Sequence, residues 1–175
     1  MKRREFLVVT AAVPMAGAFA FAEAQQKRIS GRSVFYAAVG EEVMQYDLDA
    51  TGAALIRRAS VTVPANVQEA WPHPSGKYLY VTWSNGGASY AAVNGAVPKG
   101  DKFGVSAFRI DPASGALSPH GTPAALPVRS VFVTTDIDGT HLISAFNEPS
   151  SLAVHRIMPD GTLGAEVKSK APLDC

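Results

Sequence analysis

The sequence repeats a strand-and-turn pattern, which restricts the chain to folds assembled from similar units. The clearest copy is a turn, Pro72–Gly76, followed by the aromatic and β-branched run Tyr78–Trp83. Such side chains lose rotamer freedom in a helix but fit a strand. Because this run is apolar on both faces, it predicts a buried strand. The glycine and leucine of this copy recur at the same spacing in Asp136–Phe146.

A second repeated element is an apolar strand, a turn rich in Asp, Pro and Gly, and a leucine. It occurs three times, beginning at Val43–Asp49, Val105–Asp111 and Leu152–Met158. Each copy predicts a hairpin whose turn needs glycine for its left-handed residue. One inner strand plus one hairpin, taken three times, is typical of four-stranded propeller blades.

We therefore predict an all-β fold, a partial β-propeller of about three to three and a half four-stranded blades. The expected blades lie near residues 33–63, 67–125 and 128–170. Tyr78–Trp83 is expected to be the inner strand of the second blade, and Asp136–Phe146 contains that of the third.

The first residues predict an export signal that is not part of the fold. Arg3 and Arg4 belong to a basic start, and Phe6–Phe21 is uncharged but short for a membrane span of about 20 residues. Ala22 and Ala24 fit the small-x-small pattern that a signal peptidase cuts. The beginning resembles a twin-arginine signal; a Sec signal or an uncleaved anchor is the alternative. We expect residues 1–24 to be removed, leaving a periplasmic or secreted protein without a stable membrane span.

Composition excludes several classes of function. The net charge is +1 and the pI about 7.9, so nothing favours a nucleic-acid partner. The single cysteine, Cys175, excludes an internal disulfide framework. The four histidines do not have zinc-site spacing, and there is no phosphate loop, serine-nucleophile elbow or dinucleotide fingerprint. We expect no metal and no cofactor.

Taken together, the repeats resemble the 6-phosphogluconolactonase-like lactonase family of seven-bladed β-propellers. The resemblance rests on Pro72–Thr82, on Val105–Leu117 and on Pro127–Leu163. Other propellers share some of these repeats. The signature Leu-x-Val-x-Arg-Ile-x-x-Asp-Gly-x-Leu, which ends at Leu163, favours the lactonase group.

The resemblance implies hydrolysis of a sugar lactone, or the reverse cyclisation found in muconate-type members. The ligand would be a small-molecule lactone or sugar acid. Family members are longer, and at about 40–45 residues per blade this chain is expected to be the N-terminal part of a propeller of seven blades. The family's histidine-bearing catalytic strand would then fall beyond Cys175.

Lactone hydrolysis needs a base that activates water and donors that hold the developing oxyanion. His73 precedes an expected inner strand and is a candidate base; the alternative is a turn residue. Arg129 approaches the next inner strand and could hold a carboxylate or phosphate bidentately; the alternative is a surface salt bridge. Asn147 and Glu148 end that strand and are candidate substrate-channel residues, although Asn147 also suits a turn cap.

The sequence is compatible with two classes of function. One is an exported lactonase-family enzyme that is incomplete in this chain; the other is a non-catalytic exported propeller that binds a ligand or a protein. A truncated reading frame and a ring assembled from two arcs are further alternatives. Residues 85–103 form an insertion in the second blade, which is either part of a binding face or a solvated decoration.

Overall fold

A computed structural model describes residues 33–86 and 100–168, which form antiparallel β-sheets and no helix. The chain divides into two compact units, Met1–Ser33 and Val34–Cys175, and the fold described below is that of the second. The predicted signal residues Arg3, Arg4, Ala22 and Ala24 lie outside the described residues. The strands are β1 (Ser33–Val39), β2 (Glu42–Asp49), β3 (Ala54–Thr62), β4 (Asn66–Pro72), β5 (Tyr78–Ser84), β6 (Phe103–Ile110), β7 (Leu117–Pro119), β8 (Ala124–Ala125), β9 (Phe132–Thr135), β10 (His141–Asn147), β11 (Ser150–Ile157) and β12 (Leu163–Glu166).

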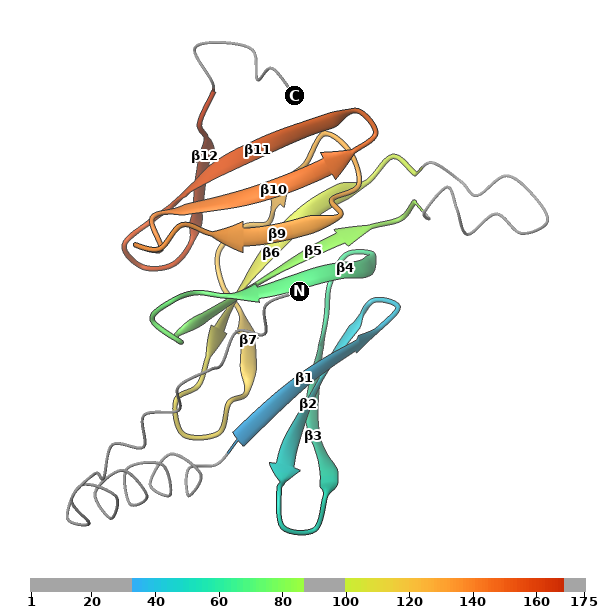
Figure 1. Ribbon diagram of the computed structural model, residues 1–175, viewed down its shortest axis with the longest axis vertical. Coiled ribbons are helices and arrows are strands. Elements are labelled where there is room, and N and C mark those ends of the chain that lie inside the picture. The colour runs from blue at the N-terminus through green and yellow to red at the C-terminus, as the bar shows by residue number, and fades with distance from the viewer. Residues whose placement is uncertain (1–32, 87–99, 169–175) are drawn as a thin grey trace, which may run out of the picture. The chain divides into compact units, whose positions relative to one another are not determined.

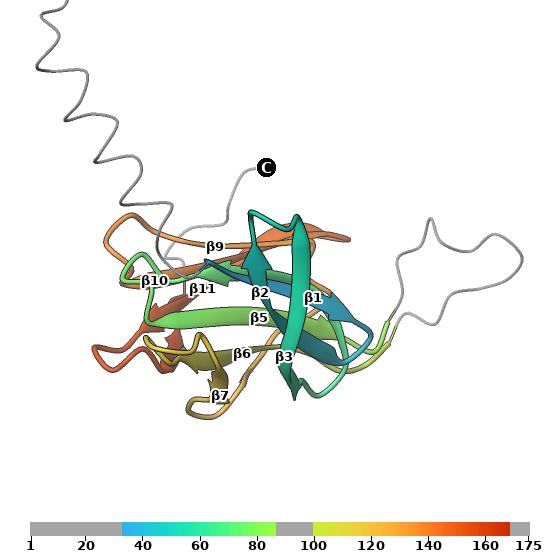
Figure 2. The same ribbon diagram turned by 90° about the horizontal axis from the view of Figure 1, so that it is seen from below.

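The strands form three meandering sheets that follow one another along the chain (Figure 1). Blade 1 has the order β1-β2-β3, and blade 2 has the order β4-β5-β6-β7, with β8 also paired to β6. Blade 3 has the order β9-β10-β11-β12. In the view from below, blade 1 lies in front of blade 2 (Figure 2). The fold is therefore all-β, a partial propeller, as the repeats predicted.

The structure corrects the prediction of which strands are innermost. The run Tyr78–Trp83 lies in β5, the second strand of its sheet, and Asp136–Phe146 contributes β10, the second strand of blade 3. The first strands, β4 and β9, are neighbours, and the rings of Trp71 and Phe132 lie 6.1 Å apart between them. The reason is burial: β5 is covered on both faces and so shows a continuous apolar run, whereas β4 mixes polar and apolar residues.

The hydrophobic core lies between the blades. One cluster joins blades 2 and 3, where Tyr80 and Val105 pack against Leu142 and Phe146. A second cluster joins blades 1 and 2, where Val43 packs with Val81 and its neighbours. Side chains alternate along β5, so its two faces serve the two clusters. Each blade is thus stabilised by burying a sheet face against the next blade.

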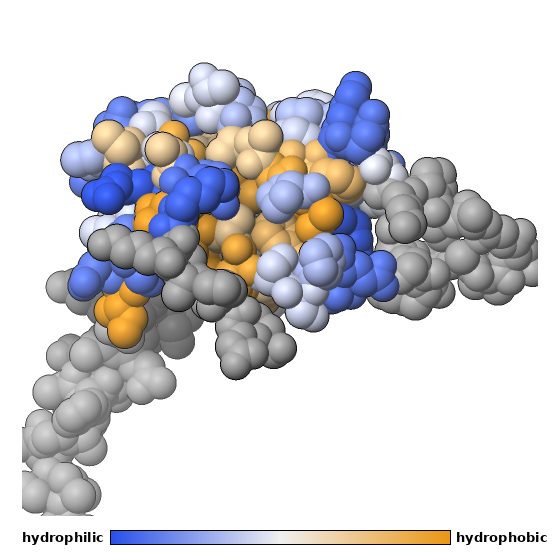
Figure 3. Space-filling view, turned by 90° about the horizontal axis from the view of Figure 1, so that it is seen from above, coloured by the Kyte–Doolittle hydropathy of each residue, from blue (hydrophilic) through white to orange (hydrophobic). Residues whose placement is uncertain are grey.

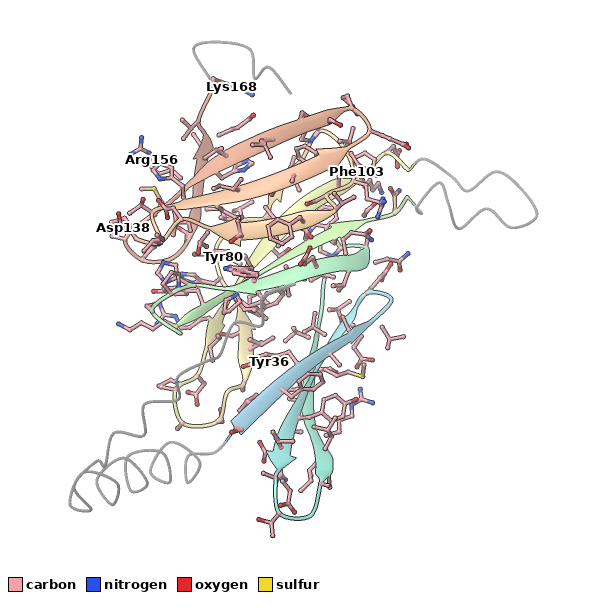
Figure 4. All side chains as sticks on the ribbon, viewed as in Figure 1. Tyr36, Tyr80, Phe103, Asp138, Arg156 and Lys168 are labelled. Atoms are coloured by element: carbon pink, nitrogen blue, oxygen red, sulfur yellow. The ribbon has the colours of Figure 1, made fainter. Side chains whose placement is uncertain are left out.

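The same hydrogen bond recurs at both blade interfaces. Tyr36 of β1 donates to the carbonyl oxygen of Gly115 in blade 2 (2.6 Å), and Tyr80 of β5 donates to that of Gly161 in blade 3 (3.0 Å). Tyr36 and Tyr80 point from their strands towards the following blade (Figure 4). Gly161 has φ +86°, and a Cβ there would collide with the ring of Tyr78. The turn must therefore be glycine for the two blades to approach.

The far faces of the first and last blades leave apolar side chains exposed. Phe35, Leu48 and Leu55 are exposed on blade 1. On blade 3, Leu152 is exposed and faces Ala145 across the β10–β11 ladder. Hydrophobic surface is visible from the blade 3 side (Figure 3).

Replacing Tyr80 with Phe should lower the free energy of unfolding by about 1–2 kcal/mol, because the buried carbonyl of Gly161 loses its donor. Burial raises the pKa of Tyr80, so its hydroxyl remains a donor throughout the physiological range. Urea denaturation of the purified chain measures the change. Tyr46→Phe is the matched control, since the Tyr46 hydroxyl contacts only the Met44 sulfur at 3.4 Å in a part-buried position. Equal stability of the two variants would contradict the proposed importance of this hydrogen bond.

His155 should make the fold sensitive to acid. It is buried in β11, and its Nδ1 has no hydrogen-bond partner among the described residues. Burial lowers the pKa of His155; the Glu166 carboxylate opposes this shift and Lys168 adds to it. Below about pH 6.5 the unfolded chain therefore binds a proton that the folded chain excludes, and the free energy of unfolding falls.

The measurement is urea denaturation of the wild type and of His155→Phe between pH 5 and 8. The wild type should lose stability as the pH falls below about 6.5, with full stability above it. The variant should show a smaller slope, because phenylalanine takes no proton. Parallel slopes would show that another group causes the pH dependence.

Candidate functional site

The two ends of the blades differ in the connections that they carry. One end, here called the tight-turn end, holds the short glycine turns that begin at His73, Asp111, Asp136 and Met158. The other, the loop end, holds the connections 63–65, 85–102 and 126–131 and the β10–β11 turn. Figure 1 shows the two ends on opposite sides of the blades. The longest connection between described strands, 85–102, lies at the loop end, and long loops commonly carry binding residues, so the loop end is the better location for a site.

Arg129 lies at the loop end, in the connection between β8 and β9. It is half-buried, and its Nη1 donates to Oε1 of Gln68 at 2.9 Å. Gln68 belongs to β4, the first strand of the neighbouring blade. The pair therefore joins the entry of blade 3 to the inner edge of blade 2.

Gln68 reaches this position because β4 contains a bulge. Val67 pairs with Trp83 and Glu69 pairs with Thr82, so Gln68 is an extra residue with no partner in β5. A bulge redirects a side chain and is common beside functional sites. The amide is held at both atoms, because Nε2 donates to the carbonyl oxygen of Asn66 at 2.9 Å while Oε1 accepts from Arg129.

Arg129 does not form the surface salt bridge that was the alternative prediction. Among residues 33–86 and 100–168, no carboxylate makes an ion pair with it. A guanidinium has five N–H donors, and Gln68 accepts one of them through a neutral oxygen. The group is oriented without being neutralised by a direct partner, which suits it to bind an anion.

Asn147 and Glu148 lie at the same end as Arg129. Asn147 ends β10 and pairs with Ser150 across the turn to β11. Asn147 and Glu148 are both exposed. The amide of Val131, two residues after Arg129, donates to the carbonyl oxygen of Ala145 at 2.9 Å. This bond holds the Arg129 connection against the last part of β10.

His73 lies at the tight-turn end, away from Arg129. Its Nδ1 is 2.8 Å from Oγ of Ser75, and its Nε2 is 2.9 Å from the carbonyl oxygen of Gly139 in blade 3. Its ring also meets that of Tyr78 edge-on, at 5.7 Å between centroids. Both ring nitrogens are engaged in contacts within and between blades. This placement favours the turn interpretation of His73 over that of a base.

Asp136 is a polar centre that sequence reasoning did not single out. Its carboxylate accepts hydrogen bonds from Thr140 and from both the backbone and the side chain of His141. Partial burial would raise the pKa of Asp136, but these hydrogen bonds outweigh it and the pKa is lowered. Every partner lies in the same turn, so the arrangement stabilises the β9–β10 connection.

The base of the 85–103 insertion is fixed by Asn85, while residues 87–99 lie outside the described residues. Oδ1 of Asn85 accepts from the amides of Asp101 (3.0 Å) and Lys102 (2.9 Å), and its Nδ2 donates to the Asp101 carboxylate. Asn85 thereby closes the loop where it leaves the sheet.

The described segments lack two kinds of feature. No group of three or more His, Cys, Asp or Glu residues there could hold a metal ion. Nor does any helix within those segments have the length and apolarity to cross a membrane.

Successive antiparallel meanders of three to five strands, with a cationic group at the loop end, define the class of protein as a β-propeller with a candidate anion site. The sequence matches the family described as "Lactonase, 7-bladed beta-propeller" over residues 31–172, and the chain belongs to this family. No curated protein matches the chain by sequence.

Solved structures share the fold. A candidate 6-phosphogluconolactonase from Bacteroides fragilis aligns with a TM-score of 0.59 at 18% identity over 76% of this chain and 34% of its own. A similar candidate from Bacteroides uniformis gives 0.56 at 18% identity, over 74% and 34%. The periplasmic gluconolactonase of Pseudomonas aeruginosa gives 0.56 at 23% identity, over 78% and 38%. This chain therefore spans little more than a third of the length of these proteins.

Replacing His73 with Phe should reduce stability, because the ring packing is kept while the hydrogen bonds to Ser75 and Gly139 are lost. We expect the free energy of unfolding to fall by about 1 kcal/mol in urea denaturation. Ser75→Ala, which removes the Oγ contact of Nδ1 and keeps the hydrogen bond that the Ser75 amide donates to it, is the control and should cost less. A His73→Phe variant as stable as the wild type would show that the contact between the blades contributes nothing.

Proposed function

We propose that this chain forms part of an exported lactonase that hydrolyses a sugar lactone bound at the loop end. Family membership and the fold shared with gluconolactonase-type proteins support the reaction class. The observation that carries the location is the Arg129 guanidinium, held by Gln68 and free of an ion pair to any described carboxylate. The basic N-terminal sequence and the periplasmic location named for the Pseudomonas protein support export.

In the proposed reaction, water attacks the carbonyl carbon of the lactone and its oxygen acquires negative charge. The ring C–O bond then breaks, and the ring oxygen takes a proton and leaves as the hydroxyl of the sugar acid. Arg129 would stabilise negative charge on the substrate or product through its remaining N–H groups. Asn147 and Glu148 would line the same end of the site.

The proposal places the general base outside residues 33–86 and 100–168. His73 lies at the opposite end of the blades, and its two ring nitrogens contact Ser75 and Gly139. The family resemblance suggests a histidine in a later blade. A non-catalytic binding propeller is the second candidate function, because Arg129 and Gln68 by themselves provide an anion-binding pair.

Replacing Arg129 with Gln tests the proposal. Hydrolysis of glucono-δ-lactone and of 6-phosphogluconolactone is followed as acid release above the spontaneous rate, and 6-phosphogluconate binding is followed by calorimetry. The protein of which this chain forms part should hydrolyse at least one lactone, and Arg129→Gln should lower its kcat/KM by about tenfold or more. Arg109→Gln is the matched control, since Arg109 is exposed and pairs with Tyr78 near the tight-turn end.

The outcomes separate the two candidate functions. Binding that depends on Arg129 without any hydrolysis would contradict the lactonase and support the binding propeller. Neither binding nor hydrolysis, or equal effects of the Arg129 and Arg109 substitutions, would overturn the location of the site.

A further inference from the structure

We propose that Gln68 is a positioning residue that makes Arg129 selective for an anionic group, a phosphate or a carboxylate, on the sugar ligand. This inference rests on the proposed function, because it assigns the class of substrate that the same site would prefer. It is carried by the bulge in β4, the two hydrogen bonds of the Gln68 amide and the half-buried position of Arg129.

The bulge in β4 sets the position of the Gln68 side chain. A regular β4 would leave no extra residue between Val67 and Glu69. The extra residue lets the Gln68 amide bind the backbone of its own strand through Nε2 and the neighbouring blade through Oε1. Since the Asn66 carbonyl can only accept, Nε2 must face it, and Oε1 is thereby directed to Arg129. The orientation of the Gln68 amide, meaning which way Oε1 and Nε2 face, is therefore determined by its two partners.

The hydrogen bond to Gln68 orders the guanidinium of Arg129. A long arginine side chain loses much rotamer freedom when it is ordered, and an arginine that is already held binds a ligand at a smaller entropic cost. One N–H of Arg129 is used to hold it, and a planar group with five N–H donors can still offer a pair of them to two oxygens of one anion.

The partner that orients Arg129 also decides how much of its positive charge is left for a ligand. Arginines in partly buried positions are commonly oriented by a carboxylate, which also cancels much of their attraction for an anionic ligand. Here a neutral amide does the orienting, so the positive charge is kept for the ligand. A glutamate at position 68 would preserve the hydrogen bond to Arg129, lose the one to the Asn66 carbonyl and neutralise the positive charge, and this difference in charge makes the proposal testable.

The experiment compares Gln68→Glu, Gln68→Met and wild-type chains. The readouts are KM and kcat for glucono-δ-lactone and 6-phosphogluconolactone, and calorimetric binding of inorganic phosphate, gluconate and 6-phosphogluconate. Gln68→Glu should weaken binding of 6-phosphogluconate by about tenfold or more, and Gln68→Met by about threefold to tenfold. The KM for the uncharged lactone should change by less than about twofold in both variants.

Stability distinguishes positioning from a merely structural role. Gln68→Glu should unfold at about the same urea concentration as the wild type, because a charge-assisted hydrogen bond to Arg129 offsets the loss of the one to the Asn66 carbonyl. Gln45→Met is the matched control. Gln45 is buried and donates to the carbonyl oxygen of Ser114 between blades 1 and 2, so its loss should reduce stability and leave anion binding unchanged.

The phosphate and gluconate arms distinguish the two sources of the anion. Binding of inorganic phosphate that Gln68→Glu abolishes indicates a phosphate site, and binding of gluconate alone indicates a carboxylate site. Anion binding that is unchanged in Gln68→Glu would overturn the inference even if the wild type is an active lactonase. Anion binding that is lost in Gln68→Glu, in a wild type that hydrolyses neither lactone, would support the inference and contradict the enzymatic proposal.

Discussion

The packing of one blade against the next is the interaction on which the rest of this structure depends. The apolar clusters lie between sheets, so no blade has a core of its own. At both interfaces a tyrosine hydroxyl binds the carbonyl oxygen of a glycine in the following blade. Only glycine fits there, because at Gly161 a side chain would collide with Tyr78. The stability of each blade therefore depends on its neighbours, as expected when each repeat buries its apolar face only by stacking.

This packing leaves a division of roles between the two ends of the blades. The tight-turn end is held together by side chains such as His73, Tyr80 and Asp136, which bind backbone groups within and between turns. The loop end carries the connection 85–102 and the one that contains Arg129. Stability and the proposed binding would therefore draw on different residues. Substitutions at the two ends should accordingly have separable effects.

Much of the fold was predictable, because periodic apolar runs and glycine turns are local properties that repeat in the sequence. The buried character of Tyr78–Trp83 follows directly from such a run. The position of β4 as the innermost strand was missed, since an edge strand with polar residues carries no continuous apolar signal. Arg129 was identified by its place before a repeated strand, whereas Gln68 carried no signal, because a bulge depends on register with a partner strand.

The sequence by itself determined that this protein is an all-β repeat, because β-branched and aromatic runs separated by glycine turns have no comparable helical solution. It also determined which residue types could bind an anion. Only the tertiary structure decided which of these meet, by placing Gln68 of one blade beside Arg129 of the next and moving His73 to the opposite end. The physical reason is that contacts between blades join residues about 60 positions apart, and no local pattern records the register and twist that bring them together.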